Sequence, residues 1–308
     1  MQRRTKLIIP IMILTLVSLN IKVWGGSVEK KPVPVKTKTE PAKSVHKGLG
    51  IGLRLYGGLG YIGGGDINPG VAGSLDLWGA VIFPPGAIRT GVYKPLHAGF
   101  NGGFDILVYL QSNWGITLGI DYLKASRTSE ARFDFGSEYS VFTITPQVSA
   151  IPLKLGLFLE KPLGTKMNLA LYGGAAYYLA RFKYDLSFAS IGYWSSITAD
   201  TSAGGIGFNG GAALELELSK KLFFFIEALG RYARISGFTG TQTTKDSDSP
   251  GSSNPSTIYF LNANTSQGRF HMLIPGKEFP DDPDFSEVRE AVIDFSGFST
   301  RAGLRIKF

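Results

Sequence analysis

The sequence predicts an all-β protein, an eight-stranded antiparallel up-and-down β-barrel. Three observations predict this fold. Apolar residues recur with a period of two along the folded part, the connections between strands alternate between long and short, and the composition is unusual. The chain holds 40 glycines, 13 tyrosines and 21 phenylalanines, which favour strands, tight turns and close backbone contacts over long helices.

Residues 1–26 are expected to form a secretory signal peptide. A positively charged start is followed by a mostly apolar stretch of 13 residues at 7–19, which fits such a signal. The stretch is short for a membrane-spanning helix, which needs about 20 residues, although an uncleaved anchor stays an alternative. Residues 27–47 are rich in Lys and Pro without hydrophobic periodicity, which predicts a short disordered periplasmic linker.

Residues 48–308 carry the predicted barrel. In one segment Ile116, Leu118 and Ile120 share one face, opposite Thr117 and Asp121, and such alternation is typical of a strand with one apolar face. No segment shows a convincing helical period. The fourth strand could begin later, near residue 148, because a proline interrupts it. The eight predicted strands are 49–61, 97–110, 114–127, 138–160, 167–183, 203–218, 222–236 and 291–308.

The connections between these strands alternate strictly in length. The long ones are 62–96, 128–137, 184–202 and 237–290, and the short ones are 111–113, 161–166 and 219–221. A barrel in the bacterial outer membrane has this pattern, with long outer loops and short periplasmic turns. Most of the strands also exceed the roughly 9–11 residues that a tilted strand needs to cross a bilayer. We therefore predict a transmembrane barrel in the outer membrane of a diderm bacterium.

Tyrosines indicate which face of the barrel meets lipid. Each of the four predicted strands that lead into a long connection carries a tyrosine near that connection, on the apolar face of the strand. These residues are Tyr61, Tyr122, Tyr177 and Tyr232. Tyrosine is enriched at the membrane–water interface, where the ring lies in hydrocarbon and the hydroxyl lies among headgroups. The four residues therefore predict an aromatic girdle.

Charged residues occupy the other face of the strands. Five are acidic and five are basic: Arg54, Asp105, Asp121, Lys154, Glu215, Glu217, Glu227, Arg231, Arg301 and Arg305. An eight-stranded barrel has room inside only for side chains, and buried charges must be paired. Equal numbers allow complete pairing, so we predict a lumen closed by ion pairs and no large steady conductance.

The remaining signals exclude several classes of function. Residues 48–308 have 22 basic and 22 acidic residues, whereas a nucleic-acid-binding domain concentrates positive charge on its folded part. There is no cysteine, and the three histidines lack the spacing of zinc ligands. A Gly-x-Gly-x-x-Gly match at 58–63 leads into loop sequence rather than a helix. We predict no catalytic, cofactor-binding or metal-binding residue and no enzymatic activity.

The layout resembles that of the eight-stranded outer-membrane barrels, such as the transmembrane domain of outer membrane protein A and the opacity-type barrels. In that family the last strand ends in an assembly signal, and its places are occupied here by Arg301, Gly303, Ile306 and Phe308. The resemblance implies recognition by the barrel-assembly machinery. Family members of the outer membrane protein A type often carry a separate peptidoglycan-binding domain, and we expect none after Phe308 here.

These features predict a non-enzymatic protein that is embedded in outer-membrane lipid. We expect a structural or adhesion-like role, in which connections 62–96 and 237–290 contact a host or matrix ligand. Two alternatives stay open: a porin-like channel for small solutes or hydrophobic compounds, and a lipid-modifying enzyme of the same fold.

Overall fold

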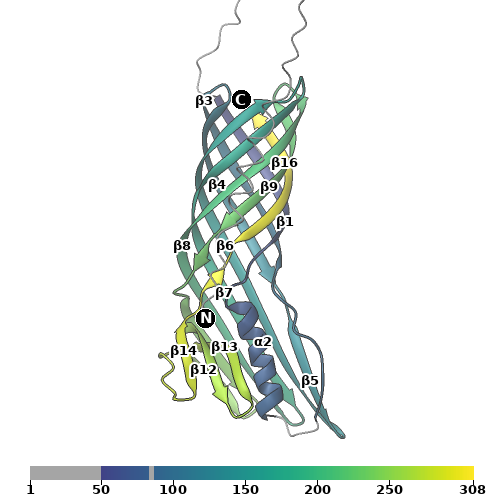
Figure 1. Ribbon diagram of the computed structural model, residues 1–308, viewed down its shortest axis with the longest axis vertical. Coiled ribbons are helices and arrows are strands. Elements are labelled where there is room, and N and C mark those ends of the chain that lie inside the picture. The colour runs from purple at the N-terminus through teal and green to yellow at the C-terminus, as the bar shows by residue number, and fades with distance from the viewer. Residues whose placement is uncertain (1–49, 83–86) are drawn as a thin grey trace, which may run out of the picture. The chain divides into compact units, whose positions relative to one another are not determined.

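The computed structural model describes residues 50–82 and 87–308. The predicted signal peptide, residues 1–26, and the predicted linker, residues 27–47, lie outside the described residues. The described chain is mostly antiparallel β-structure (Figure 1), which confirms the all-β class.

Eight of the strands pair in a closed ring. Each pairs antiparallel with its neighbours in the order β1–β3–β4–β6–β7–β8–β9–β16, and β16 pairs back with β1. A sheet that closes on itself leaves no edge strand. The ring strands are β1 (Gly50–Tyr61), β3 (Ala98–Gln111), β4 (Trp114–Ser126), β6 (Glu138–Pro162), β7 (Met167–Ser190), β8 (Tyr193–Ser219), β9 (Leu222–Tyr232) and β16 (Gly297–Lys307).

Glycines make room for large side chains inside this narrow ring. A Cβ atom added to Gly119 would lie 2.8 Å from Cε of Lys154, and one added to Gly303 would lie 2.9 Å from Cζ of Phe225. An eight-stranded barrel is only wide enough for side chains to fill. A bulky side chain on one strand therefore requires a glycine nearby, which accounts for part of the high glycine content.

Three ring strands, β6, β7 and β8, continue well beyond the other five, and their polarity reverses on the way. Every second residue of β6 faces outward. These residues are leucine or isoleucine from Leu159 to Ile151, and serine, glutamine or threonine from Ser149 to Thr143. The inward residues change in the opposite sense, because Lys154 is the last charged one and those from Pro152 to Phe142 are all apolar.

The outward residues change from apolar to polar at the same level on neighbouring strands. Ile151 pairs with Leu179 of β7, and two residues further on Ser149 pairs with Arg181. Arg181 in turn pairs with Ser202 of β8. Side chains alternate strictly along a strand, so a reversal of polarity with no slip in register means that the surroundings of the wall change there.

This level divides the described chain into two parts. We call the ring between the short turns and the Ile151–Leu179 pair the proximal barrel. We call the rest of the described chain, residues 62–82, 87–97, 127–150, 180–203 and 233–296, the distal module. In Figure 1 the short turns and the C-terminus lie at the top and the distal module at the bottom.

Further strands widen the sheet of the distal module. β5 takes over from β4 as the neighbour of β6, and β11 takes over from β9 as the neighbour of β8. The added elements are α2 (Ile67–Leu77), the π-helix η1 (Trp78–Ile82), β2 (Ile88–Thr90), β5 (Ser129–Phe135), β10 (Arg234–Ile235), β11 (Thr239–Asp246), β12 (Ser249–Thr265), β13 (Gly268–Gly276), β14 (Phe285–Glu290) and β15 (Ile293–Asp294).

The α2 helix and η1 connect the two ends of this widened sheet. A Cβ atom on Gly70 of α2 would lie 2.7 Å from Cδ1 of Leu273 in β13, so the helix packs closely on that strand. At its other end, Trp78 of η1 lies 4.5 Å from the ring of Phe142 in β6. The space enclosed between them is an apolar core, with fully buried residues that include Phe133, Phe142, Phe182, Phe238, Ile258 and Phe295.

The prediction of eight strands was too low. The described residues form a 14-stranded sheet and a separate two-stranded sheet, because the stretches taken as long connections contain strands of their own. The stretch 184–202 is mostly the continuation of β7 and β8. The β11–β12 hairpin is rich in Thr and Ser, so it offers no apolar alternation by which it could be recognised.

The alternative start of the fourth strand near residue 148 was also wrong, since β6 begins at Glu138. Pro146 is tolerated because it lies between two neighbours of β6. The pairing with β4 ends at Gln147, and the pairing with β5 begins at Ile144. The missing N–H group therefore falls where the ladder of hydrogen bonds is already interrupted.

The expectation that no segment is helical was wrong for α2. Its buried positions, which include Ile67, Gly70, Val71, Ser74 and Leu75, follow helical spacing. Two of these five are Gly and Ser, so the apolar stripe is incomplete in the sequence. The close approach of the helix to β13 requires small residues there, and the same requirement hides the helical period.

Candidate functional site

The candidate site is the interior of the proximal barrel, where charged side chains from seven strands meet. The structure places nine of the ten predicted residues there, each at most 9% exposed. They are Arg54, Asp105, Asp121, Lys154, Glu215, Glu227, Arg231, Arg301 and Arg305. Every second residue of a ring strand points inward, which explains why parity alone could identify them.

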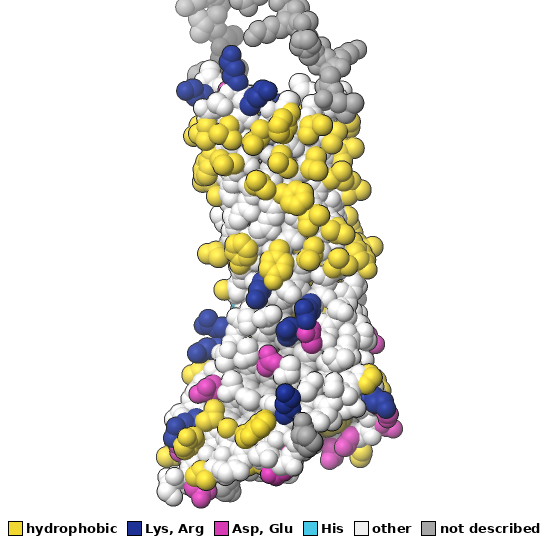
Figure 2. All heavy atoms as spheres, turned by 180° about the vertical axis from the view of Figure 1, so that it is seen from behind, with side chains coloured by type: hydrophobic (Ala, Val, Ile, Leu, Met, Phe, Trp, Pro, Cys, Tyr) yellow, Lys and Arg dark blue, Asp and Glu magenta, His cyan; other side chains and the backbone are white. Residues whose placement is uncertain are grey.

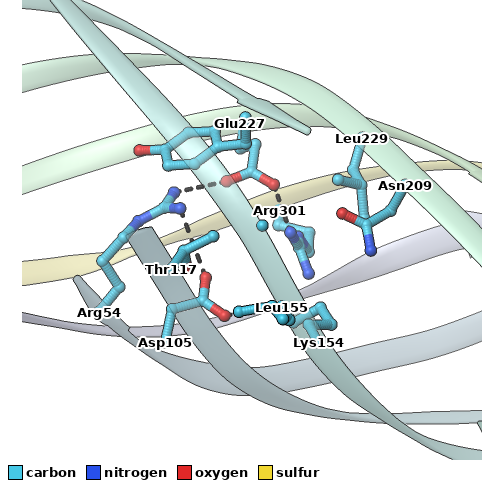
Figure 3. A pocket seen from close by; sticks show the side chains of 11 residues that line it. Arg54, Asp105, Thr117, Lys154, Leu155, Asn209, Glu227, Leu229 and Arg301 are labelled. Atoms are coloured by element: carbon cyan, nitrogen blue, oxygen red, sulfur yellow. Dashed lines mark hydrogen bonds and ion pairs between the residues drawn. The ribbon is translucent and has the colours of Figure 1, made fainter. Parts of the chain in front are cut away.

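Glu227 of β9 holds two arginines together at the centre of this interior (Figure 3). Nη2 of Arg54 donates a hydrogen bond of 2.5 Å to one carboxylate oxygen, and Arg301 donates to the other. The guanidinium of Arg54 also lies 3.9 Å from the centre of the Phe225 ring, at cation–π distance. All three charged residues are at most 2% exposed, so each depends on its partners for compensation.

Lys154 extends this network to two more carboxylates. Its Nζ lies 2.7 Å from Asp105 and 2.8 Å from Asp121. It also donates a hydrogen bond of 2.5 Å to the hydroxyl of Tyr56, and that hydroxyl lies within hydrogen-bond distance of both aspartates, to either of which it can donate its one hydrogen. Arg301 lies 3.1 Å from Asp121, which closes a continuous circuit of alternating charges around the ring.

A second cluster lies nearer the short turns, around Arg305. This arginine pairs with Glu160 and, at 2.8 Å, with Glu215. The hydroxyl of Tyr109 donates a hydrogen bond of 2.6 Å to Glu160. Glu160 was missed in the sequence because it falls at the very end of the predicted fourth strand. It has the same parity as Lys154, and that spacing could have identified it.

Glu217 was expected in the lumen, but the structure places it elsewhere. It is half-buried beside the register shift at the end of β8, and no ion pair involves it among the described residues. Arg231 does point inward, but its hydrogen bonds go to Ser299 and to the backbone oxygens of Tyr61 and Phe295. Glu217 is therefore not one of the fully buried charges that need a partner in the lumen.

The charges inside the proximal barrel balance. With Glu160 in place of Glu217, the described lumen holds five acidic and five basic side chains. The cavity among Arg54, Lys154, Glu227 and Arg301 measures about 20 Å³, and a single water needs about 10–15 Å³. This cavity has room for about one water molecule, so side chains fill most of the space around the central charges.

The four tyrosines predicted as a girdle all lie on the outer wall near the distal end of the proximal barrel. Their exposed fractions range from 38% to 59%. Large apolar side chains cover the wall on the side of the short turns, and Figure 2 shows them as a band that ends before the distal module. They include Ile51, Leu55, Leu59, Leu118, Leu155, Leu157, Leu171, Ile226 and Leu304.

The residues of the predicted assembly signal lie on β16 and just after it, at the seam with β1. Arg301 points inward, and Gly303 leaves room for the ring of Phe225. Ile306 and Phe308 point outward, and the Phe308 N–H donates a hydrogen bond of 2.8 Å to the Ile51 carbonyl.

The described residues hold no group of three or more His, Asp or Glu side chains that could bind a metal ion. His97 bonds to the carbonyl of Ile62, and His271 contacts the side chain of Asn262. In the part of the chain that the structure covers, no helix is long and apolar enough to cross a membrane.

No family model matches the chain, and no curated protein matches it. Among solved structures, it is similar to the crystal structure of the outer membrane protein OprG from Pseudomonas aeruginosa, with 12% sequence identity and a TM-score of 0.36. That match covers 86% of this chain and 98% of the other.

We predict that Glu227→Gln destabilises the protein by about 3–5 kcal/mol, the usual cost of removing one partner of a buried ion pair. Arg54 and Arg301 would both lose their shared carboxylate in a space with no room for bulk water. The free energy of unfolding, measured by urea titration in detergent micelles, tests this. The matched control is Glu217→Gln, which should change it by less than about 0.5 kcal/mol; equal losses in the two variants would contradict the network.

Proposed function

We propose that this chain is an integral outer-membrane β-barrel protein of a diderm bacterium, without enzymatic activity. Its sealed proximal barrel would span the membrane and hold the distal module outside the cell for contact with other surfaces. The observation that carries the proposal is the reversal of polarity along β6, β7 and β8. An apolar wall around a charged interior suits lipid, and a polar wall around an apolar core suits water.

The length of the apolar wall supports the membrane assignment. On β1 it runs from Ile51 to Tyr61, and on β16 from Phe298 to Phe308, ten residues apart in each case. At about 3.4 Å per residue and a tilt of about 40°, ten residues rise by about 25 Å. Barrels of the outer membrane have an apolar band of about this height.

The orientation follows from the connections. Short turns face the periplasm and long connections face outward in such barrels, which places the distal module outside. The aromatic girdle of Tyr61, Tyr122, Tyr177 and Tyr232 would then mark the outer interface. The C-terminal residues would be read by the barrel-assembly machinery during biogenesis, as the family resemblance implies.

A channel is the weaker alternative because the cavity among the central charges of the described barrel is too small to be a path. A porin-like pore needs a water-filled interior, and a cavity of about 20 Å³ between paired charges does not supply one. The apolar core of the distal module would obstruct the outer entrance as well. We therefore propose that the proximal barrel is an anchor and that the distal module is a contact surface.

The tip of the β7–β8 hairpin is the best candidate for that contact. Ile191, Tyr193 and Trp194 are 39–63% exposed there, and Tyr139 of β6, 44% exposed, lies on the same end of the sheet. These side chains would not reach the membrane that the proximal barrel spans, because the tip of the hairpin lies fourteen residues beyond Tyr177. Exposed Trp and Tyr side chains are typical of the residues that dominate binding energy at protein interfaces.

The seal can be tested by electrophysiology. We expect the refolded protein to insert into planar lipid bilayers and to show no steady conductance of nanosiemens size. Replacement of Arg54, Glu227 and Arg301 by serine together should open space and produce stepwise currents. Steady nanosiemens currents from the wild-type protein would contradict the sealed lumen.

The contact surface can be tested separately, on whole cells. The variant Ile191→Ser/Tyr193→Ser/Trp194→Ser should reduce adhesion to immobilised matrix proteins or host cells at least tenfold. The matched control replaces Ser187, Ser195 and Ser196, which lie on the same hairpin, by alanine. Deletion of 237–290 is unsuitable, because it removes Phe238, Ile258 and Leu273 from the core. Unchanged adhesion at normal surface level would exclude the tip as the contact site.

A further inference from the structure

We infer that the outer wall carries a lipid-binding site where the proximal barrel meets the distal module. Two adjoining apolar grooves would hold acyl chains of a phosphorylated glycolipid of the outer leaflet, the lipid A class. Lys94, Lys124 and Arg127 would contact its phosphates. The inference rests on the membrane orientation proposed above and adds a specific ligand class to it.

The grooves lie side by side over β1, β3, β4 and β16. The first, of about 400 Å³, runs between Leu59 and Phe100 toward Tyr122 and Lys124. The second, of about 350 Å³, is bounded by Tyr61 and Phe298. Leu59, Gly60 and Ala98 line both grooves, so the two are separated only by small or slender side chains.

The walls of the grooves are aromatic and ordered by stacking. The ring of Tyr61 stacks against His97 at 4.6 Å and against Phe298 at 5.6 Å. The floor is low at Ala98, an exposed outward position of β3 that carries only a methyl group. A hollow with rigid walls and an apolar floor at the girdle level suits an acyl chain better than a flat wall does, because more of the chain surface is covered.

Cations gather directly beyond the grooves. Lys124 lines the first groove, and Arg127 follows three residues later. The backbone N–H of Lys94 donates a hydrogen bond of 2.9 Å to Ser129 Oγ, which brings Lys94 beside the same end of β4. All three side chains are exposed, and none of the three forms an ion pair within residues 50–82 and 87–308.

Two basic residues at this level of β7, Arg181 and Lys183, are already neutralised. Arg181 donates hydrogen bonds to Asp200 of β8, and Lys183 lies 3.5 Å from the same carboxylate. The hydrogen bonds from Arg181 hold the pKa of Asp200 below its ordinary value, as expected for a carboxylate that stays ionised beside cations. On the β7–β8 side of the wall these cations are therefore paired, whereas the three beside the grooves are not.

Charge and position select the glycolipid over a phospholipid. A phospholipid of the common anionic type presents one phosphate and two chains, whereas lipid A presents two phosphates and more chains on one sugar backbone. Three free cations beside two adjoining grooves match the larger ligand. A juxtamembrane Lys or Arg contributes about 1 kcal/mol of attraction to an anionic lipid surface, so three should act as a strong electrostatic clamp.

The test is native mass spectrometry of the full chain, refolded without lipid in detergent micelles and titrated with defined lipids. Bisphosphorylated lipid A should bind at micromolar or lower concentration, and phosphatidylglycerol at least tenfold more weakly. The variant Lys94→Gln/Lys124→Gln/Arg127→Gln should weaken lipid A binding about 100-fold. Ala98→Trp, which fills both grooves, should abolish binding without removing a charge.

Matched controls separate the site from general charge and hydrophobicity. Lys166→Gln/Lys220→Gln/Lys221→Gln removes three exposed cations at the short turns, and Ala212→Trp adds an outward indole on β8; both should change binding less than twofold. Equal effects of the two triple variants, or equal binding of phosphatidylglycerol, would overturn the inference. A protein that inserts and stays silent in bilayers but binds no lipid A would refute this site alone, whereas failure to insert would refute the proposed function.

Discussion

The structure depends on one constraint: the interior of an eight-stranded ring is too narrow to hold bulk water, so every charge inside must find its partner there. Nine of the ten charged side chains in the described lumen lie in ion pairs, and the tenth, Arg231, hydrogen-bonds to Ser299 and to backbone oxygens. Breaking one buried pair typically costs about 3–5 kcal/mol, whereas in the intact circuit every carboxylate lies beside at least one cation. The glycines follow from the same constraint, because Arg54, Lys154 and their partners need space that only missing side chains can provide.

The distal module continues the wall of the barrel with the opposite distribution of polar and apolar side chains. Past the Ile151–Leu179 pair the same strands, in unbroken register, turn polar side chains outward and apolar ones inward. A barrel built only for lipid would end at this level in open loops. Here α2 and the added strands enclose an apolar core, so the module is held rigidly on its anchor. In the proposed function, rigidity at this point would suit a contact surface far from the membrane.

Much of this arrangement could be predicted from the sequence, because period two and parity are local properties. The ring strands, the short turns and nine lumen charges followed from them. The prediction that Glu217 lies in the lumen was wrong because the alternation of residues does not reveal where a strand leaves the packed interior. The α2 helix and the β11–β12 hairpin were not predicted for another reason. Contacts with residues distant in sequence, such as that of Leu273 with Gly70, require small or polar residues there, and such residues show no hydrophobic periodicity.

The absence of cysteine allows a direct measurement of the central claim, that the surroundings of the wall change from lipid to water at one level. Single cysteines at the outward positions 157, 155, 153, 151, 149, 147 and 145 of β6 would carry a spin label in proteoliposomes. We expect access to oxygen rather than to a water-soluble nickel reagent from 157 to 151, and the reverse at 147 and 145. Equal access to the nickel reagent along the whole series would contradict the account.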